Sequence, residues 1–178
     1  MDIDSAKQLA LTLKQDLTVE YAFLHDWRIE FDNAKRRAGV CRLKLRVIGL
    51  SIYHVRLNSD SVISDTILHE LAHAIAYTLY GEVGHGFHWK NVARKIGATP
   101  KSTGKFNLPQ APWILVLFCP TFNQLEEVSQ RFRRNKNIRY FALRGRPETK
   151  GCLYYISSNE LNRYKEGLIA INQLNLIQ

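Results

Sequence analysis

The chain has 178 residues, of which 46% are hydrophobic and 23% charged, a balance typical of a globular protein and not of a disordered one. Its formal net charge is +9, and the excess is concentrated in residues 89–150, which contain 13 basic and 3 acidic side chains. This concentration predicts a surface for a polyanion, with nucleic acid as the first candidate. A basic face that only contacts water would give the same composition.

Targeting and cysteine patterns restrict the class of protein further. The first residues lack the apolar core of a signal peptide, and the longest apolar run, residues 113–119, is too short to cross a bilayer. Three widely spaced cysteines argue against a secreted disulfide scaffold. We therefore expect a soluble intracellular protein with no membrane partner, cytoplasmic or nucleoid-associated in a bacterium and nuclear in a eukaryote.

The first third of the chain combines one helical pattern with three extended ones. Residues 4–17 carry leucines at a spacing of four, which predicts an amphipathic helix. Alternating apolar and polar side chains predict strands over residues 27–31 and 41–47, and a third strand is expected over residues 48–53. These strands would form a small antiparallel sheet.

Two further helices and a domain boundary follow. Capping residues and apolar spacing predict a helix from Asp60 or Ser61 to Tyr80, ended by Gly81. A second helix is predicted over residues 87–96. Prolines and small polar residues then indicate a boundary near residues 98–112. We expect one domain over residues 1–108 and another over residues 109–178.

The second domain has a weaker pattern, which predicts short strands and a final helix. Apolar runs suggest strands over residues 113–119, 139–143 and 152–156, and a capping pattern at Ser157 begins a helix that continues to about Ile171. The expected fold class is α+β, with a helical core and a small antiparallel sheet, followed by a ribbon-like β region and a C-terminal helix.

The strongest chemical signal is an H-E-x-x-H motif, His69-Glu-Leu-Ala-His73, inside the longest predicted helix. Side chains four residues apart share a helix face, so both imidazoles can bind one metal ion. Glu70 lies about 100° around the helix from His69, where it can reach a water molecule at the metal. The alternative is three polar residues on a helix surface. Apolar neighbours such as Leu68, Leu71 and Ile75 disfavour it, because buried polar groups need partners.

A catalytic zinc ion normally has a third protein ligand, and the chain offers three candidates: Glu82, His85 and His88. Gly84 and Gly86 flank His85 and would let the backbone turn tightly toward the preceding helix, which favours His85. Asp65 precedes His69 by four residues and could orient its imidazole, although an acidic residue near a helix N-terminus needs no such role.

The motif and the segment Gly84-His85-Gly86-Phe87-His88-Trp89 together resemble the SprT-like zinc metallopeptidases, the family that includes the DNA-dependent protease Spartan. The likeness extends over roughly residues 20–100. It implies a zincin-like helical core with one catalytic Zn²⁺ held by His69, His73 and His85, and with Glu70 as the general base. It also implies an endopeptidase that cleaves DNA-bound or DNA-crosslinked proteins and is stimulated by DNA.

The second domain departs from this family at two positions. Where many bacterial members carry paired cysteines, Cys119 and Cys152 each stand alone, as in a zinc ribbon that has lost half its cysteines. We expect both thiols to be small buried hydrophobic groups, with a second metal or a disulfide as alternatives. The expected apolar core of the ribbon consists of Phe118, Phe122, Tyr140, Tyr154 and Tyr155.

The basic excess of this domain is interleaved with aromatic residues, which suits single-stranded or frayed DNA because guanidinium groups bind phosphates and exposed rings stack on bases. In the alternative, the rings are core and the basic groups only contact water. If the zinc site were structural, the chain would be a non-catalytic zinc-containing nucleic-acid-binding protein. The candidate DNA-binding residues are Arg131, Arg133, Arg134, Lys136, Arg139, Arg144 and Arg146.

Overall fold

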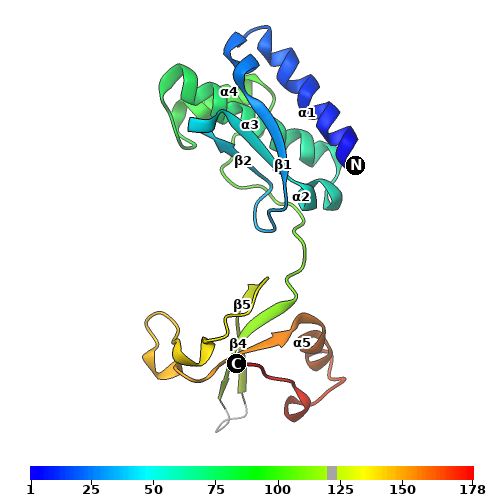
Figure 1. Cartoon of the computed structure of the whole chain (residues 1–178), viewed down its shortest axis with the longest axis vertical. Coiled ribbons are helices and arrows are strands. Elements are labelled where there is room, and N and C mark those ends of the chain that lie inside the picture. The colour runs from blue at the N-terminus through cyan, green and yellow to red at the C-terminus, as the bar shows by residue number, and fades with distance from the viewer. Residues whose placement is uncertain (120–123) are drawn as a thin grey trace. The chain divides into compact units, whose positions relative to one another are not determined.

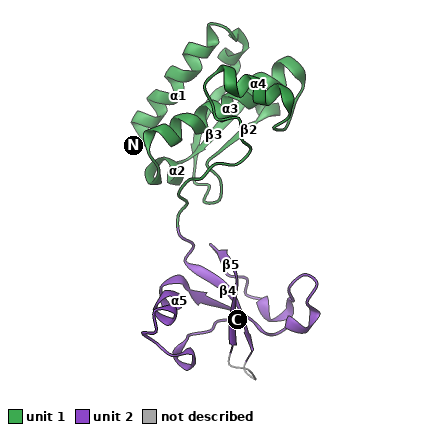
Figure 2. Cartoon of the chain, turned by 180° about the vertical axis from the view of Figure 1, so that it is seen from behind, with its two compact units in different colours: residues 1–109 green, residues 110–178 purple. Residues whose placement is uncertain are grey.

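The computed structural model describes residues 1–119 and 124–178, and the chain divides into two compact units, residues 1–109 and residues 110–178 (Figure 2). Both units combine helices with a three-stranded sheet, so the predicted α+β class is confirmed (Figure 1). No helix within the described residues has both the length and the apolar character that crossing a bilayer requires.

The sheet of the first unit is mixed. Its strand order is β1-β3-β2, and β3 runs antiparallel to β2 but parallel to β1. The predicted antiparallel pairing is therefore confirmed for β2 and β3 but is wrong for β1 and β3. The other pair is parallel because the chain crosses from β1 to the far side of β3 before it returns. The strands are β1 (Arg28–Asp32), β2 (Gly39–Arg42) and β3 (Val47–Ser51).

The predicted strand over residues 41–47 is wrong beyond Arg42. Arg42 pairs with Val47, so the four residues between them must reverse the chain. They form a 3₁₀ turn over Leu43–Leu45 and end at Arg46, which adopts the left-handed conformation with φ of 51°. Apolar and basic side chains alternate through this turn as they would in a strand, so the sequence pattern does not reveal the turn.

The third predicted strand ends earlier than expected, because a short helix takes its last residues. The side chain of Ser51 accepts a hydrogen bond from the backbone N–H of His54 and thereby caps α2 (Ile52–Leu57). The amphipathic helix predicted near the N-terminus is confirmed as α1 (Ile3–Thr18).

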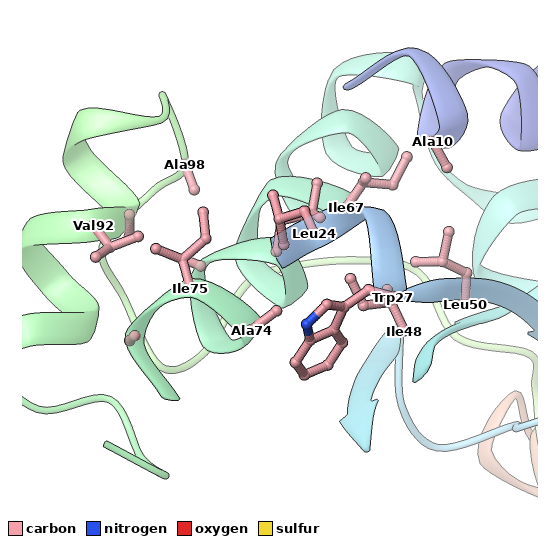
Figure 3. Close-up of a cluster of buried hydrophobic side chains, with 14 of the residues drawn as sticks. Ala10, Leu24, Trp27, Ile48, Leu50, Ile67, Ala74, Ile75, Val92 and Ala98 are labelled. Carbon is pink, nitrogen blue, oxygen red and sulfur yellow. The ribbon is translucent and has the colours of Figure 1, made fainter. Parts of the chain in front are cut away.

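The long helix α3 (Asp60–Tyr80) forms the centre of the first unit and matches its prediction, including its end at Gly81 with φ of 69°. All residues from Glu70 to Ala76 are buried, so this part of the helix is enclosed on every side. Figure 3 shows Ile67 and Ile75 of α3 among the core side chains that also include Trp27. The helix α4 (Phe87–Lys95) packs against α3, as its apolar spacing predicts.

The second unit is an antiparallel sheet in the order β5-β4-β6, with one helix after the last strand. The predictions for β4 and for β6 are confirmed. The final helix begins after the Ser157 cap as predicted but ends at Lys165, since Gly167 has a positive φ of 73°. The elements are β4 (Trp113–Cys119), β5 (Gln124–Arg131), β6 (Leu153–Ser157) and α5 (Ser158–Lys165).

Two strand predictions in this unit fail for identifiable reasons. The sequence does not predict strand β5, because its apolar residues Leu125 and Val128 are three positions apart instead of two. The structure accommodates this spacing with a bulge at Val128, where the register with β4 shifts between Leu115 and Val116. The strand predicted over residues 139–143 is wrong, since Ile138–Tyr140 is a 3₁₀ turn.

The apolar core of the second unit differs in part from the predicted one. Tyr155 is buried and Phe118 and Tyr154 are half-buried, but Tyr140 is 65% exposed, because its turn directs Ile138 inward instead. The predicted core residue Phe122 lies outside the described residues. Cys119 and Cys152 are half-buried free thiols, so the alternative of a disulfide is wrong.

A buried histidine gives the first unit a pH-dependent stability. His54 has no exposed surface; its Nε2 lies 3.0 Å from the hydroxyl of Thr66, and its Nδ1 lies 3.2 Å from the amide nitrogen of Asn58. Burial lowers the pKa of His54 below its ordinary 6.5. Below pH ~6.5 the His54 imidazole is therefore protonated in the unfolded chain but stays neutral in the folded chain. The free energy of unfolding falls as the pH drops through this range.

We accordingly expect thermal unfolding of the wild type to shift to lower temperature between pH 7.5 and pH 5.5. His54→Gln should show a smaller shift over this interval, although it is less stable at pH 7.5. The exposed His25 provides the control, since His25→Gln should keep the wild-type dependence. Equal pH dependence in the wild type and His54→Gln would contradict the assignment.

Candidate metal centre

Three histidines meet where α3 faces the loop before α4. His69 and His73 lie one turn apart on α3, and His85 lies in the loop that follows Gly81. Within the described residues, these form the one group of three or more potential metal ligands whose ligand atoms all lie within 4.8 Å of one another. The structure thus brings together the residues that the sequence singles out.

The spacing of the ring nitrogens fits a tetrahedral metal ion. The Nε2 atom of His85 lies 3.1 Å from Nε2 of His73 and 3.1 Å from Nε2 of His69. Two ligands of a tetrahedral zinc ion, each ~2.05 Å from the metal, stand ~3.3 Å apart. A single hydrogen on His85 Nε2 could serve only one of its two neighbours, whereas a cation accepts a lone pair from all three rings.

The surroundings keep these rings in the neutral form that binds metals. Burial lowers the pKa of His69 to about 4 and that of His73 to about 3, and neighbouring histidines add to both effects. Burial, with a contribution from Lys90, also lowers the pKa of His85. All three are therefore unprotonated at neutral pH and ready to act as ligands.

Trp89 packs against all three imidazoles and was missed as a site residue. The centre of its ring lies 4.8 Å from that of His69, 5.2 Å from that of His73 and 4.5 Å from that of His85. Trp89 is fully buried, so it fixes the rings from the side of the core. The apolar pattern of the helix predicted over residues 87–96 indicates only that the Trp89 side chain faces the core.

The two other candidate ligands have different roles. The carboxylate of Glu82 accepts hydrogen bonds of 3.1 Å each from the backbone N–H groups of His88 and Trp89, and so caps the N-terminus of α4. Desolvation opposes ionisation of Glu82, but these donors hold its pKa below the usual range. The ring of His88 stacks on Tyr80 at 4.2 Å. Neither side chain belongs to the histidine cluster.

The chain bends at residues 84–86 and brings His85 back to α3, as expected, although neither glycine beside His85 has a positive φ. A Cβ atom at Gly86 would lie 2.7 Å from Oε1 of Glu82, so a larger residue there would push the Glu82 carboxylate out of its capping position. A Cβ atom at Gly84 would meet no atom within 4 Å.

Glu70 lies beside the histidines and is only 7% exposed. Burial raises the pKa of Glu70 to about 7, against the opposing effects of the Arg37 charge and a hydrogen bond from the backbone of Cys41. A Cβ atom at Gly39 would lie 2.8 Å from both Cγ and Oε1 of Glu70. The strand β2 therefore fits closely against a carboxyl group that can exchange a proton near neutral pH.

A cavity of about 1330 Å³ gives access to this site. Its lining includes Glu70 and the three histidines, residues 36–41 on one side and residues 101–106 on another. Asp65 also lines it, and its carboxylate accepts a hydrogen bond of 2.7 Å from the backbone N–H of Thr99. Asp65 thus links the segment after α4 to α3. This contact is separate from the predicted orientation of the His69 imidazole by Asp65.

The candidate DNA-binding residues all lie in the second unit and differ in their surroundings. Arg146 pairs with Glu126 and Glu148, which reduces its availability for a phosphate. The guanidinium of Arg134 lies 4.5 Å from the ring centre of Trp113, and that of Arg139 lies 5.6 Å from that of Tyr140. Arg131 is half-buried. The exposed members are Arg133, Arg134, Lys136, Arg139 and Arg144.

Comparison with known proteins matches residues 7–110 to the SprT-like family. The chain is 33% identical over 82 residues to Protein SprT of Vibrio parahaemolyticus, covering 45% of this chain and 50% of that protein. It is 36% identical over 69 residues to Protein SprT of Vibrio atlanticus, covering 38% of this chain and 42% of that protein.

The chain therefore spans about half the length, or less, of these curated relatives. No solved structure matches it. The family match covers more than half of the chain and includes all three clustered histidines and Glu70, so the chain belongs to the SprT-like family.

Proposed function

We propose that the chain is a zinc-dependent endopeptidase that cleaves DNA-bound or DNA-crosslinked proteins and is stimulated by DNA. The observation that carries the proposal is the convergence of three neutral imidazoles beside a buried carboxyl group in one cavity. Membership of the SprT-like family supports it. A metal site that served structure alone would need neither Glu70 nor a cavity around it.

The chain's own residues suffice for the acid–base part of peptide hydrolysis. When bound by His69, His73 and His85, Zn²⁺ supplies Lewis acidity that polarises the scissile carbonyl and makes water more acidic. Glu70 takes the proton from the attacking water and gives it to the departing amine. The hydrogen bond from Cys41 and the close fit of Gly39 keep the Glu70 carboxylate in one position during both transfers.

The proposed DNA contact rests on the second unit. Arg133, Lys136 and Arg144 are exposed and have no acidic partner among the described residues. Tyr140 and Phe141 are 65% and 51% exposed, so their rings are available to stack on unpaired bases. These exposed rings favour single-stranded or frayed DNA over a basic face that only contacts water.

The test is cleavage of a DNA-bound protein by the zinc-loaded chain, with and without single-stranded DNA. We expect fragments that depend on DNA and disappear with a chelator. The combined replacement of Arg133, Lys136 and Arg144 by alanine should weaken DNA binding and lower its salt slope by about 2, at ~0.7 per lost phosphate contact. Arg146→Ala is the matched control, because Glu126 and Glu148 already pair with its charge.

Other outcomes point to different functions. Fragments that form equally well without DNA would indicate a peptidase for free proteins. Bound zinc and tight DNA binding without any fragments would favour the alternative, a non-catalytic zinc-containing nucleic-acid-binding protein.

A further inference from the structure

The cavity at the candidate metal centre has a basic rim. Arg36 and Arg37 line it from the segment before β2, and Lys101 and Lys105 line it from the segment after α4. We call these four residues the basic rim. All of them belong to the first unit and are distinct from the candidate DNA-binding residues of the second.

The acidic groups in and around the cavity compensate the charge of the basic rim only in part. The lining contains two of them: Glu70, which is buried and receives a backbone hydrogen bond, and Asp65, which accepts the N–H of Thr99. In the described part of the chain, Arg36, Lys101 and Lys105 are exposed, and their side chains form no ion pair or hydrogen bond. A ligand in this cavity therefore meets an excess of positive charge.

Arg37 adds a donor that the protein leaves unused. Its Nη2 atom pairs with Asp32, whereas its Nη1 atom is buried and has no hydrogen-bond partner within the described residues. Its charge acts on the carboxyl group of Glu70, so it lies close to the catalytic end of the cavity. A buried N–H without an acceptor is costly. Because Arg37 also lines the cavity, a rotation of its guanidinium toward an anionic oxygen on a bound ligand would give this donor a partner.

These observations identify a substrate class. Any polypeptide cleaved beside the histidines must occupy the cavity that they share with the basic rim. We propose that the cavity selects polypeptide segments with aspartate or glutamate near the scissile bond, through Arg37 and the basic rim. This inference rests on the proposed endopeptidase function. A nucleic-acid strand in the same cavity would exclude the polypeptide, which makes it a competing occupant that the test can detect.

The test uses pairs of peptides that differ only by glutamate or glutamine at positions near the scissile bond, chosen from cleavage of a randomised peptide library by the full chain. We expect kcat/KM to favour the glutamate peptides by about tenfold, as charge-assisted hydrogen bonds allow, and the preference to shrink as salt is added. Arg37→Gln should remove most of this preference. Lys101→Gln combined with Lys105→Gln should reduce it by about two- to fivefold, and these exposed positions do not endanger folding.

Arg56→Gln is the matched control, because Arg56 is exposed on α2 and does not line the cavity. Binding of the same peptides to the whole 178-residue chain with Glu70→Gln gives a readout that does not need catalysis. Absence of any cleavage together with tighter binding of glutamate peptides would overturn the peptidase and support the acidic selection. Equal handling of glutamate and glutamine peptides, or competitive displacement of peptide by a short single-stranded DNA, would overturn the acidic selection.

Discussion

We expect Glu70→Gln to bind zinc as the wild type does and to lose proteolysis by roughly 10²–10⁴-fold, the usual contribution of a general base. Glutamine has nearly the shape of glutamate and can still receive the Cys41 hydrogen bond, so the histidine cluster keeps its arrangement. Its amide cannot accept and release a proton at neutral pH. The loss should therefore fall on kcat and leave the metal content unchanged.

Metal analysis and a cleavage assay on the same preparation check this expectation. His73→Ala is the counterpart, since it removes one of three converging imidazoles and should lower zinc content along with activity. Proteolysis at the wild-type rate in Glu70→Gln would show that another group carries the proton. Loss of zinc in Glu70→Gln would show that this carboxyl group is needed for the metal site.

A second large effect is expected from a single methyl group at Gly39. In Gly39→Ala the new Cβ atom would lie 2.8 Å from Cγ and Oε1 of Glu70, closer than side chains can approach. Glu70 is only 7% exposed, and its side chain must shift to make room. A displacement of about 1 Å at a reacting group can cost ~10²-fold in rate, and we expect a loss of that size with normal zinc content.

Gly84→Ala is the matched control for this variant. It introduces the same methyl group next to His85, where no atom lies within 4 Å and φ is not positive. Activity close to that of the wild type is expected. If Gly39→Ala and Gly84→Ala were equally active, the fit of β2 against Glu70 would have no part in catalysis.

The parts of the fold that sequence analysis predicted are those with strong local signals. The helix α3 was predicted with its end because its apolar residues and Gly81 lie within one continuous segment. The strand β4 was predicted because seven apolar residues follow one another. By contrast, the turn over Leu43–Leu45 and the bulged strand β5 depend on pairing with another strand, which local patterns do not reveal.

The same distinction applies to the site. The spacing of His69 and His73 along one helix predicts that they lie together, and the structure places His85 beside them. The contacts of Trp89 with all three rings follow from the packing of α4 on α3, and the contact of Gly39 with Glu70 joins residues 31 positions apart. Such contacts require the tertiary structure.

The cap that Glu82 forms on α4 also bears on how a bound metal ion would leave. Two imidazoles belong to α3, whereas the third belongs to the loop that Glu82 ties to the N–H groups of His88 and Trp89. For His85 to leave the cluster, the hydrogen bonds between Glu82 and the N-terminus of α4 must break. This is a local unfolding event much smaller than loss of the whole fold. Deuterium exchange at those two amides would therefore follow the opening that limits metal dissociation, and the residence time of the ion would be set by a helix cap.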